Sequence, residues 1–436
     1  MKDVSTKQSR RSFAYYLLIF ASIFLYVALT TSKNLYTAEQ TTLLDLGIFG
    51  NRTDLASTME YYFYTYAAMQ IMLVFFVKKI NIKWFLTLTL GASAILTVLV
   101  AFTGSINEHY VIFSVLGILQ AGIWGCLLNM LSVYLPSRLL PLANQIMTAG
   151  PAIAGALGYA TAAAFGDDWK APFFVLGIIV FAAVVLYFFA ITFMSKFPRE
   201  PETVRIVSED GTEKSVSVDD DNDFIHLDNK RRVGYFYAFS ILMGFLFTSL
   251  YFMVNNNLSM YLKDVGHYSN DVSKWLTVLA PIFAVLGPLV VVRICEAHKN
   301  FITVCACFFG LSLLFAGALL ISCDKSSIVS LVFLVIFLVS VNGGRSVSLS
   351  IASLRMRSKI NTGVFSTAVN AVSSIASGVT PKIITRILDN SSSDILHGWK
   401  ISFLIIFIWN LVVVGLLIGF IALVKWLNRR DAKSAA

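Results

Sequence analysis

The sequence predicts an all-α integral membrane protein whose twelve transmembrane helices form two pseudo-symmetric six-helix bundles. Three observations predict this fold class: an apolar composition, repeated apolar runs, and one long hydrophilic stretch near the middle of the chain. Hydrophobic residues make up 57% of the 436 positions and charged residues 14%. In a typical soluble domain, roughly 45–50% of the residues are apolar and about 25% are charged. The mean hydropathy of +0.74 agrees with a chain that crosses a membrane many times.

Apolar runs of the length that a helix needs to cross a bilayer, about 20 residues, recur along the chain. Six are predicted before the hydrophilic stretch and six after it. The predicted spans are 13–32, 58–77, 84–103, 110–135, 139–165, 171–195, 234–256, 274–293, 301–321, 327–351, 361–387 and 401–425.

The hydrophilic stretch, Lys196–Arg232, is rich in both acids and bases and has no hydrophobic periodicity. Such a composition cannot bury enough apolar surface to offset the entropy of ordering, so we expect a solvated linker. The sequence therefore predicts an N-terminal six-helix bundle at 1–195, a cytoplasmic linker at 196–232 and a C-terminal six-helix bundle at 233–436.

The basic residues predict the orientation. If both termini and the linker are cytoplasmic, nine of the 34 Lys and Arg lie outside or at outer helix ends, Arg345 lies within a span, and the other 24 lie inside. Lys and Arg accumulate on the cytoplasmic side of membrane proteins. We therefore expect cytoplasmic termini in a plasma (inner) membrane. The net charge of +9 reflects this topology, and we expect no nucleic-acid partner.

The two halves repeat a local pattern. A loop after the first span leads to Thr53-Asp54 at the start of the second, and a loop after the seventh leads to Asn270-Asp271 at the start of the eighth. Each pair supplies side-chain acceptors for the free N–H groups of the next helix. Two parallel halves of six helices resemble the major facilitator fold, in which the solute binds at the midplane between the halves.

Short segments across the chain resemble the organophosphate:phosphate antiporter family, which includes the glycerol-3-phosphate and hexose-phosphate carriers. The resemblance implies a secondary carrier whose cavity is lined by helices 1, 4, 7 and 10. The segments that carry it are Lys33-Asn34, Thr53–Leu55, Gly117 with Gln120 and Trp124, Asp168-Trp169, Tyr261–Val265, His267–Ser269 and Val272–Trp275.

Two positions depart from that family. It grips phosphate with one Arg near the outer end of helix 1 and another on helix 7, where this sequence has Ser32 and Tyr251. A doubly charged anion leaving water needs two or more fixed cationic donors. We therefore expect another small polar solute, anionic or zwitterionic, such as an organic acid, amino acid, nucleoside or sugar derivative. Organophosphate exchange remains an alternative.

Arg345 is the strongest single candidate for solute binding. It lies about ten residues, or about 15 Å of helix, from the basic cluster Arg355–Lys359. Inserting an Arg at the centre of a membrane span costs at least ~2.5 kcal/mol of free energy, so such a residue is a candidate for a functional role. We expect it to face the solute. The alternative is an Arg that pairs with backbone carbonyls in an inner gate.

Helical spacing groups further polar candidates. Tyr26, Thr30 and Lys33 share one face of helix 1, and Tyr251 shares a face of helix 7 with Asn255. These faces would offer the solute neutral hydrogen-bonding groups and one ammonium. The alternative for the tyrosines is simple packing.

Helix 4 adds Gln120 and Asn129, polar groups that need partners in an apolar span. Tyr61, Tyr62, Tyr64 and Tyr66 cover more than one face of helix 2. We interpret this run as an interfacial belt and packing residues, not as part of the site.

Lys33 and Glu60 are the candidates for coupling or gating. They lie at the outer ends of sequential antiparallel spans, so we expect them to meet, and Glu60 is the only acid within a predicted span. Glu60 would titrate if the carrier is coupled to protons. Alternatively, the two residues form a structural ion pair that closes the outer face.

The sequence thus predicts a secondary active transporter that works by alternating access, with a coupling proton or an exchanged anion. We expect a monomer in the lipid bilayer, with no catalytic centre, metal or cofactor. Gly150–Gly155 partly resembles the helix 5 motif of drug:proton exchangers, so drug efflux is an alternative. A non-transporting membrane sensor on the same fold is another.

Overall fold

The fold is helical, with one short hairpin in the linker. A computed structural model describes residues 2–76, 79–136, 139–197, 205–207, 213–215, 230–297, 301–325, 327–347 and 362–435. The elements are α1 Lys2–Asp45, α2 Arg52–Phe76, α3 Ile82–Val100, α4 Ile106–Gln120, α5 Ile123–Tyr134, α6 Leu140–Phe165, α7 Lys170–Met194, β1 Arg205–Val207, β2 Glu213–Ser215, α8 Lys230–Asn255, α9 Leu258–Asp264, α10 Asn270–Ala284, α11 Leu286–Ala297, α12 Phe301–Ser322, α13 Ser327–Ser346, α15 Thr362–Asn390 and α16 Ile395–Ala435.

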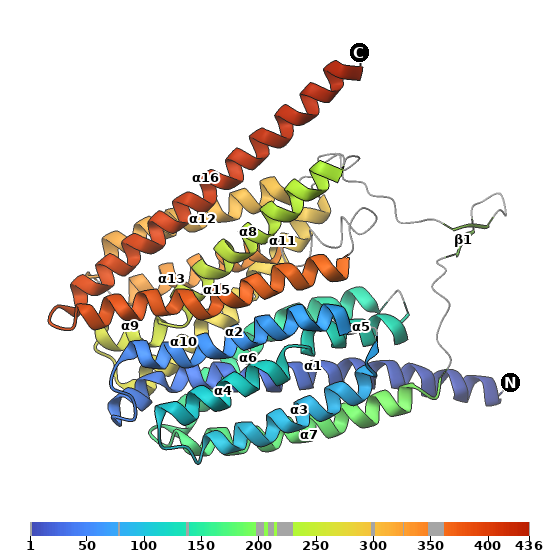
Figure 1. Ribbon diagram of the computed structural model, residues 1–436, viewed down its shortest axis with the longest axis horizontal. Coiled ribbons are helices and arrows are strands. Elements are labelled where there is room, and N and C mark those ends of the chain that lie inside the picture. The colour runs from blue at the N-terminus through green and yellow to red at the C-terminus, as the bar shows by residue number, and fades with distance from the viewer. Residues whose placement is uncertain are drawn as a thin grey trace.

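The predicted all-α membrane fold is confirmed. Within the described residues, ten helical segments are long and apolar enough to cross a bilayer. Helices α2 and α15 have 25 and 29 residues, which is also long enough, but their composition is more polar. They lie side by side (Figure 1). Many of their polar residues, such as Thr58, Gln70, Ser377 and Thr380, are buried in protein. Helices packed against protein can be less apolar than helices that face lipid.

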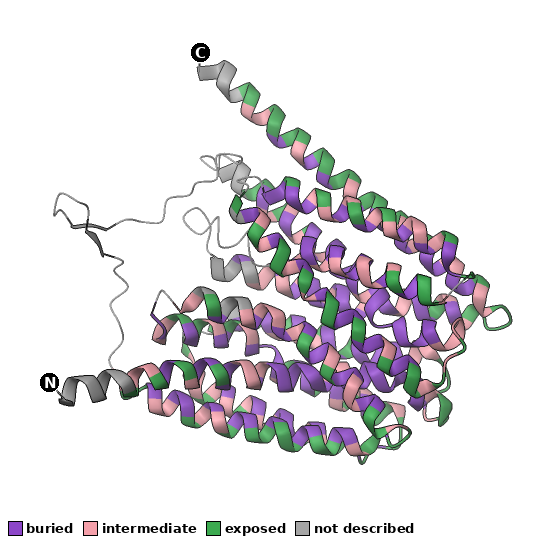
Figure 2. Ribbon diagram, turned by 180° about the vertical axis from the view of Figure 1, so that it is seen from behind, coloured by how far each residue is buried: buried purple, intermediate pink, exposed green. Residues whose placement is uncertain are grey.

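Helices α1–α7 pack mainly on one another, and so do α8–α16; the pairs α2–α15 and α6–α10 join the two sets. In Figure 1 the start of α1, the end of α16 and the strands of the linker lie at the same end of the bundle. We call the opposite end, with the α1–α2 and α15–α16 connections, the distal end. Buried residues fill the interior of each half (Figure 2).

The outer surface is apolar, as a lipid-facing surface must be. Large hydrophobic side chains such as Phe75, Phe102 and Leu314 are more than 70% exposed. In water, an exposed apolar surface of this kind would drive association. In a bilayer it contacts acyl chains instead.

Several predicted spans have different boundaries in the structure, among them those of α1, α4–α5 and α10–α11. Helix α1 runs on to Asp45, so Lys33 lies well inside the helix and not at its end. The span predicted at 110–135 is interrupted between α4 and α5 at Ala121-Gly122, where Gly122 packs closely against Phe85. The span predicted at 274–293 is interrupted between α10 and α11, four residues after Pro281, which cannot donate a backbone hydrogen bond.

The linker contains a small hairpin that the sequence did not predict. Strand β1 pairs with β2 antiparallel, with Arg205 opposite Ser215 and Val207 opposite Glu213. The other linker residues between 198 and 229 lie outside the described residues, as does the basic cluster Arg355–Lys359.

Candidate functional site

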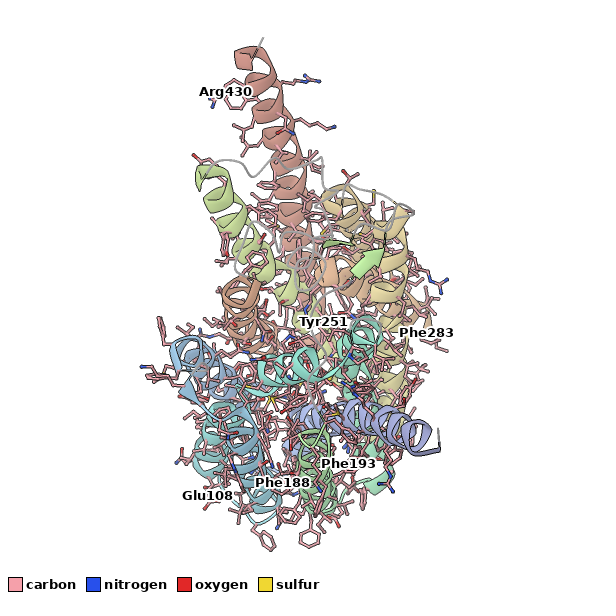
Figure 3. All side chains as sticks on the ribbon, turned by 90° about the vertical axis from the view of Figure 1, so that its right-hand side faces the viewer. Glu108, Phe188, Phe193, Tyr251, Phe283 and Arg430 are labelled. Atoms are coloured by element: carbon pink, nitrogen blue, oxygen red, sulfur yellow. The ribbon has the colours of Figure 1, made fainter. Side chains whose placement is uncertain are left out.

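The site lies where α1 and α2 of the first half meet α8 and α13 of the second. Tyr251, on α8, lies between the two halves when the molecule is viewed along its length (Figure 3). The predicted cation Arg345 lies in the last turn of α13, and its side chain is half-buried. The structure therefore brings the helix 7 and helix 10 candidates together.

Aromatic rings flank the two interior cations. The Lys33 ammonium lies 5.3 Å from the ring centre of Phe63, and the Arg345 guanidinium lies 5.3 Å from that of Tyr251 and 5.7 Å from that of Phe252. Phe63 and Phe252 contact each other edge to face across the two halves. The rings thus form a continuous connection between the two charges.

Lys33 and Arg345 lie within electrostatic range of each other, although they come from opposite halves. Both are half-buried, so water can reach them inside the bundle. Lys33 forms no ion pair with a carboxylate of the described residues. Two neighbouring positive charges in an apolar interior repel each other, and an anion between them would relieve the repulsion.

Tyr26 lies beside this cation pair. It is within electrostatic range of Arg345, and its ring packs against Trp124 of α5 at 5.3 Å. Its hydroxyl lies close to the buried Thr30. Gly150 of α6 makes room for the ring, because a Cβ at that position would lie 2.8 Å from a ring carbon.

Two tyrosines of α2 lie next to the candidate residues, although the sequence did not indicate it. Tyr62 is buried and donates a hydrogen bond of 2.8 Å to Oε1 of Gln120. Tyr66 stacks against Tyr62, lies within electrostatic range of Tyr26, and lies close to Asn370 of α15. Of the interpretation as belt and packing residues, the packing part therefore holds for these two tyrosines and the belt part does not. A helical wheel places them on one face, but only the packing shows that this face points inward.

Asn255 and Asn129 differ in their surroundings. Asn255 is buried, donates to Oδ1 of Asn256 and accepts a hydrogen bond from Tyr159 of α6 through its backbone carbonyl. Asn129 is exposed, and its backbone carbonyl accepts a hydrogen bond from Ser132. No contact in the described part of the chain joins Asn129 to the other candidates.

The expected pairing of Lys33 with Glu60 is wrong. Lys382 of α15 donates a hydrogen bond of 2.6 Å to Glu60, and Tyr64 donates another of 2.7 Å. Lys33 lies on the Phe63 ring instead. The expectation failed because it assumed that the first helix ends near Lys33, whereas α1 continues for twelve more residues to Asp45.

Nor is Glu60 the only acid within a membrane span. The longer α1 includes Glu39, which forms a fully buried ion pair of 2.9 Å with Lys274 of α10. The Lys274 ammonium also donates to the carbonyls of Ala162 and Gly166, at the C-terminal end of α6. This cluster joins three helices of both halves near the distal end. The sequence did not indicate this cluster, because Lys274 stands at the start of a predicted apolar span.

Further polar contacts join the halves at the distal end. Arg52 forms an ion pair of 2.9 Å with Asp264, and Lys263 forms one with Asp45. Asp389 of α15 accepts hydrogen bonds from the backbone N–H groups of Arg52 and Thr53, so it caps the first turn of α2 from the other half. With Glu60–Lys382 and Glu39–Lys274, these contacts join the two halves at the distal end.

The small residues of the partial helix 5 motif have a packing role in α6. A Cβ on Gly158 would lie 2.9 Å from the Cβ of Asn34, and one on Gly155 would lie 3.1 Å from that of Pro281. Small residues allow such close helix contacts in membrane proteins. In the described residues, no group of three His, Cys, Asp or Glu side chains could hold a metal ion.

A sequence profile described as Major Facilitator Superfamily matches residues 12–381, which is most of the chain. The chain belongs to the Major Facilitator Superfamily. Its predicted fold class is thereby confirmed, and with it the broad assignment as a multi-pass membrane transporter.

Solved transporter structures have the same fold. A bacterial homologue of the human lysosomal transporter Spinster, inward-facing and unoccupied, matches with a TM-score of 0.66 and 12% identity over 94% of this chain and 96% of that chain. Its inward-facing and occupied form gives 0.67 over the same shares. The nucleoside transporter NupG gives 0.60 and 13% identity, covering 93% and 98%. At these identities the likeness concerns the fold alone. No curated protein matches the sequence.

Proposed function

We propose that this major facilitator protein is a secondary active transporter of a small organic anion or zwitterion, with Lys33 and Arg345 as its binding cations. The solute would bind between the halves, next to Tyr26 and Tyr251. Thr30, Gln120 and Asn255 would supply neutral hydrogen-bonding groups around it.

The observation that carries this proposal is the pair of interior cations. Lys33 and Arg345 come from opposite halves, lie within electrostatic range of each other and contact ring faces. A cation–π contact contributes about 0.5–2 kcal/mol. Burying a charge in a membrane span costs at least ~2.5 kcal/mol. The rings offset part of this cost, and Arg345 also donates a hydrogen bond to Asn342. An anionic solute between the two cations would offset more of it, because it would relieve the repulsion between them.

The binding geometry favours one anionic group over a phosphate ester. The cations are one ammonium and one guanidinium on separate ring faces. The guanidinium can bind an oxyanion through two parallel hydrogen bonds, whereas the ammonium acts as a point charge. An organic acid, amino acid or other carboxylate solute fits this arrangement better than organophosphate exchange. A neutral nucleoside or sugar would bring no negative charge to the two cations.

Alternating access would proceed by opening and closing the distal end. The inter-half ion pairs close that end, and the similar Spinster homologue is inward-facing. The distal end would then be the outer face, with both termini cytoplasmic and the protein monomeric in a plasma membrane. Glu39 and Glu60 both pair with a Lys of the other half. Both ion pairs would break when the distal end opens and form again when it closes.

Uptake by the purified chain in proteoliposomes tests the proposal. Arg345→Gln removes one charge-assisted contact, so uptake of the transported anion at low concentration should fall roughly 10- to 150-fold. Lys33→Gln should reduce it in the same direction. Lys400→Gln is the control, because Lys400 pairs with Asp324 at an exposed site within one half. Wild-type uptake by Arg345→Gln would contradict the proposal.

A further inference from the structure

A chain of aromatic rings runs beside the two cations. Tyr66 stacks on Tyr62, Tyr62 contacts Phe63, Phe63 contacts Phe252, and Phe252 contacts Tyr251, with ring centres 5.1–5.9 Å apart. The chain begins on α2 and ends on α8, so it crosses from one half to the other. A second ring pair, Tyr26 with Trp124, lies next to it.

Part of this aromatic surface is exposed. The half-buried rings are Tyr26, Tyr66, Trp124 and Phe252, while the other rings of the chain are buried. Accessible ring surface inside the bundle contacts water when no solute is present. A solute with a ring of its own would displace that water and pack against the rings, whereas a strongly hydrated aliphatic anion would gain nothing from them.

One buried polar atom near these rings has no partner. Gln120 is 3% exposed, and its Oε1 accepts the Tyr62 hydrogen bond, but its Nε2 makes no hydrogen bond. Gln120 lies one helical turn before Trp124 along the chain, at the end of α4. A buried donor without a partner is costly, and a solute acceptor can satisfy it.

We infer that the solute is a planar, ring-bearing carboxylate. Its carboxylate would lie between Lys33 and Arg345, its ring against Tyr26, Trp124 and Tyr66, and an acceptor on the ring would meet Nε2 of Gln120. The inference rests on the proposed anion-transport function and narrows it. Trp124 becomes a residue that determines specificity for the ring and not for the charge.

Three carboxylates and one neutral nucleoside separate the ring inference from the proposed anion transport. Binding to the purified chain is measured by calorimetry with benzoate, cyclohexanecarboxylate, glucuronate and uridine. Benzoate should bind about 2- to 12-fold more tightly than cyclohexanecarboxylate for each ring contact made. Glucuronate, a sugar acid, and uridine, a neutral ring, should bind more weakly than benzoate. Equal binding of benzoate and cyclohexanecarboxylate would overturn the inference and leave the proposed function standing.

Variants test the role of Trp124. Trp124→Leu should reduce the preference for benzoate over cyclohexanecarboxylate while binding of the saturated acid persists, and Trp124→Phe should retain most of the preference. Trp84→Leu is the control, because Trp84 is half exposed and packs on Phe188 away from the site. A preference unchanged in Trp124→Leu contradicts the role of Trp124. Failure of every anion to bind the wild-type chain contradicts the proposed function itself.

Discussion

At the scale of single residues, the site differs from a phosphate carrier in how its cations are held. Phe63 supports Lys33, and Tyr251 and Phe252 support Arg345. Ring faces hold a cation without neutralising it. A carboxylate in the same place would neutralise the charge and remove its attraction for a solute. The rings therefore contact both cations without removing their positive charge.

Glycines position these side chains, and Gly117 shows how little space they have. A Cβ on Gly117 would overlap the backbone carbonyl of Tyr62 and the hydroxyl of Thr65. We expect Gly117→Ala to destabilise the protein by about 1–3 kcal/mol, because α4 would move away from α2. A lower thermal unfolding temperature in detergent would show this.

The control for this substitution is Gly415→Ala. Gly415 is exposed on α16, and a Cβ added there would meet no atom within 4 Å. Alanine favours the helix there by about 1 kcal/mol. An unchanged or higher unfolding temperature is expected, and equal effects of the two substitutions would contradict the close contact between α4 and α2.

At the scale of helices, α1 differs from its predicted span by continuing to Asp45. Its extension to Asp45 carries Glu39 into the interface with α10, where Lys274 meets both the carboxylate and the last carbonyls of α6. The C-terminal end of a helix carries partial negative charge, so it also attracts the ammonium. One lysine thus stabilises the contact of three helices.

The Glu39–Lys274 pair should therefore contribute strongly to stability. Lys274→Met leaves a buried carboxylate without its counter-charge, and we expect a loss of about 3–5 kcal/mol. The double variant E39Q/K274M should be less unstable than the sum of its single variants. Unfolding of the purified proteins measures both effects, and additive losses would contradict a direct interaction.

The exposed pair of Lys263 with Asp45 is the matched control. It also joins α1 to the second half, but its side chains are 30% and 51% exposed. Surface ion pairs contribute about 0–1 kcal/mol. Lys263→Met should therefore change the unfolding free energy far less than Lys274→Met does.

At the scale of the whole molecule, the polar contacts between the halves gather at the distal end. Asp389 caps α2 from α15, and Glu60 pairs with Lys382 along the same two helices. The polar composition of α2 and α15 follows from this role. A rocking motion of the two halves would have to break these contacts before a solute could enter from the distal side.

Thiol labelling can measure this opening. Thr42 is buried at the distal interface and hydrogen-bonds to Asn270 of the other half. In a chain whose exposed Cys307 is replaced by Ser, Thr42→Cys should label slowly, and adding Asp389→Ala should increase the rate several-fold. The reason is that the loss of the cap makes the closed state less stable.

Asp324→Asn serves as the control for labelling. Asp324 forms an ion pair of 2.8 Å with Lys400, and both residues belong to the second half. The substitution therefore removes a carboxylate contact without affecting the interface between the halves. The labelling rate of Thr42→Cys should then stay the same. An equal increase with both variants would mean that the distal contacts do not control opening.

The membrane class, the two sets of helices and the candidate cations could be predicted from the sequence, because they follow from composition and from short-range periodicity. Tyr26, Lys33, Tyr251 and Arg345 meet between the halves, but helical spacing could assign them only to faces of separate helices. The partners of each charge needed the tertiary structure.

Glu60 pairs with Lys382 and Glu39 with Lys274, across 322 and 235 positions of the chain. No local pattern carries such information, because ion pairing depends on which helices pack together and in which register. The inward-facing Tyr62 and Tyr66 give the same lesson, since a tyrosine at the lipid interface and one in a binding site have the same local sequence signal.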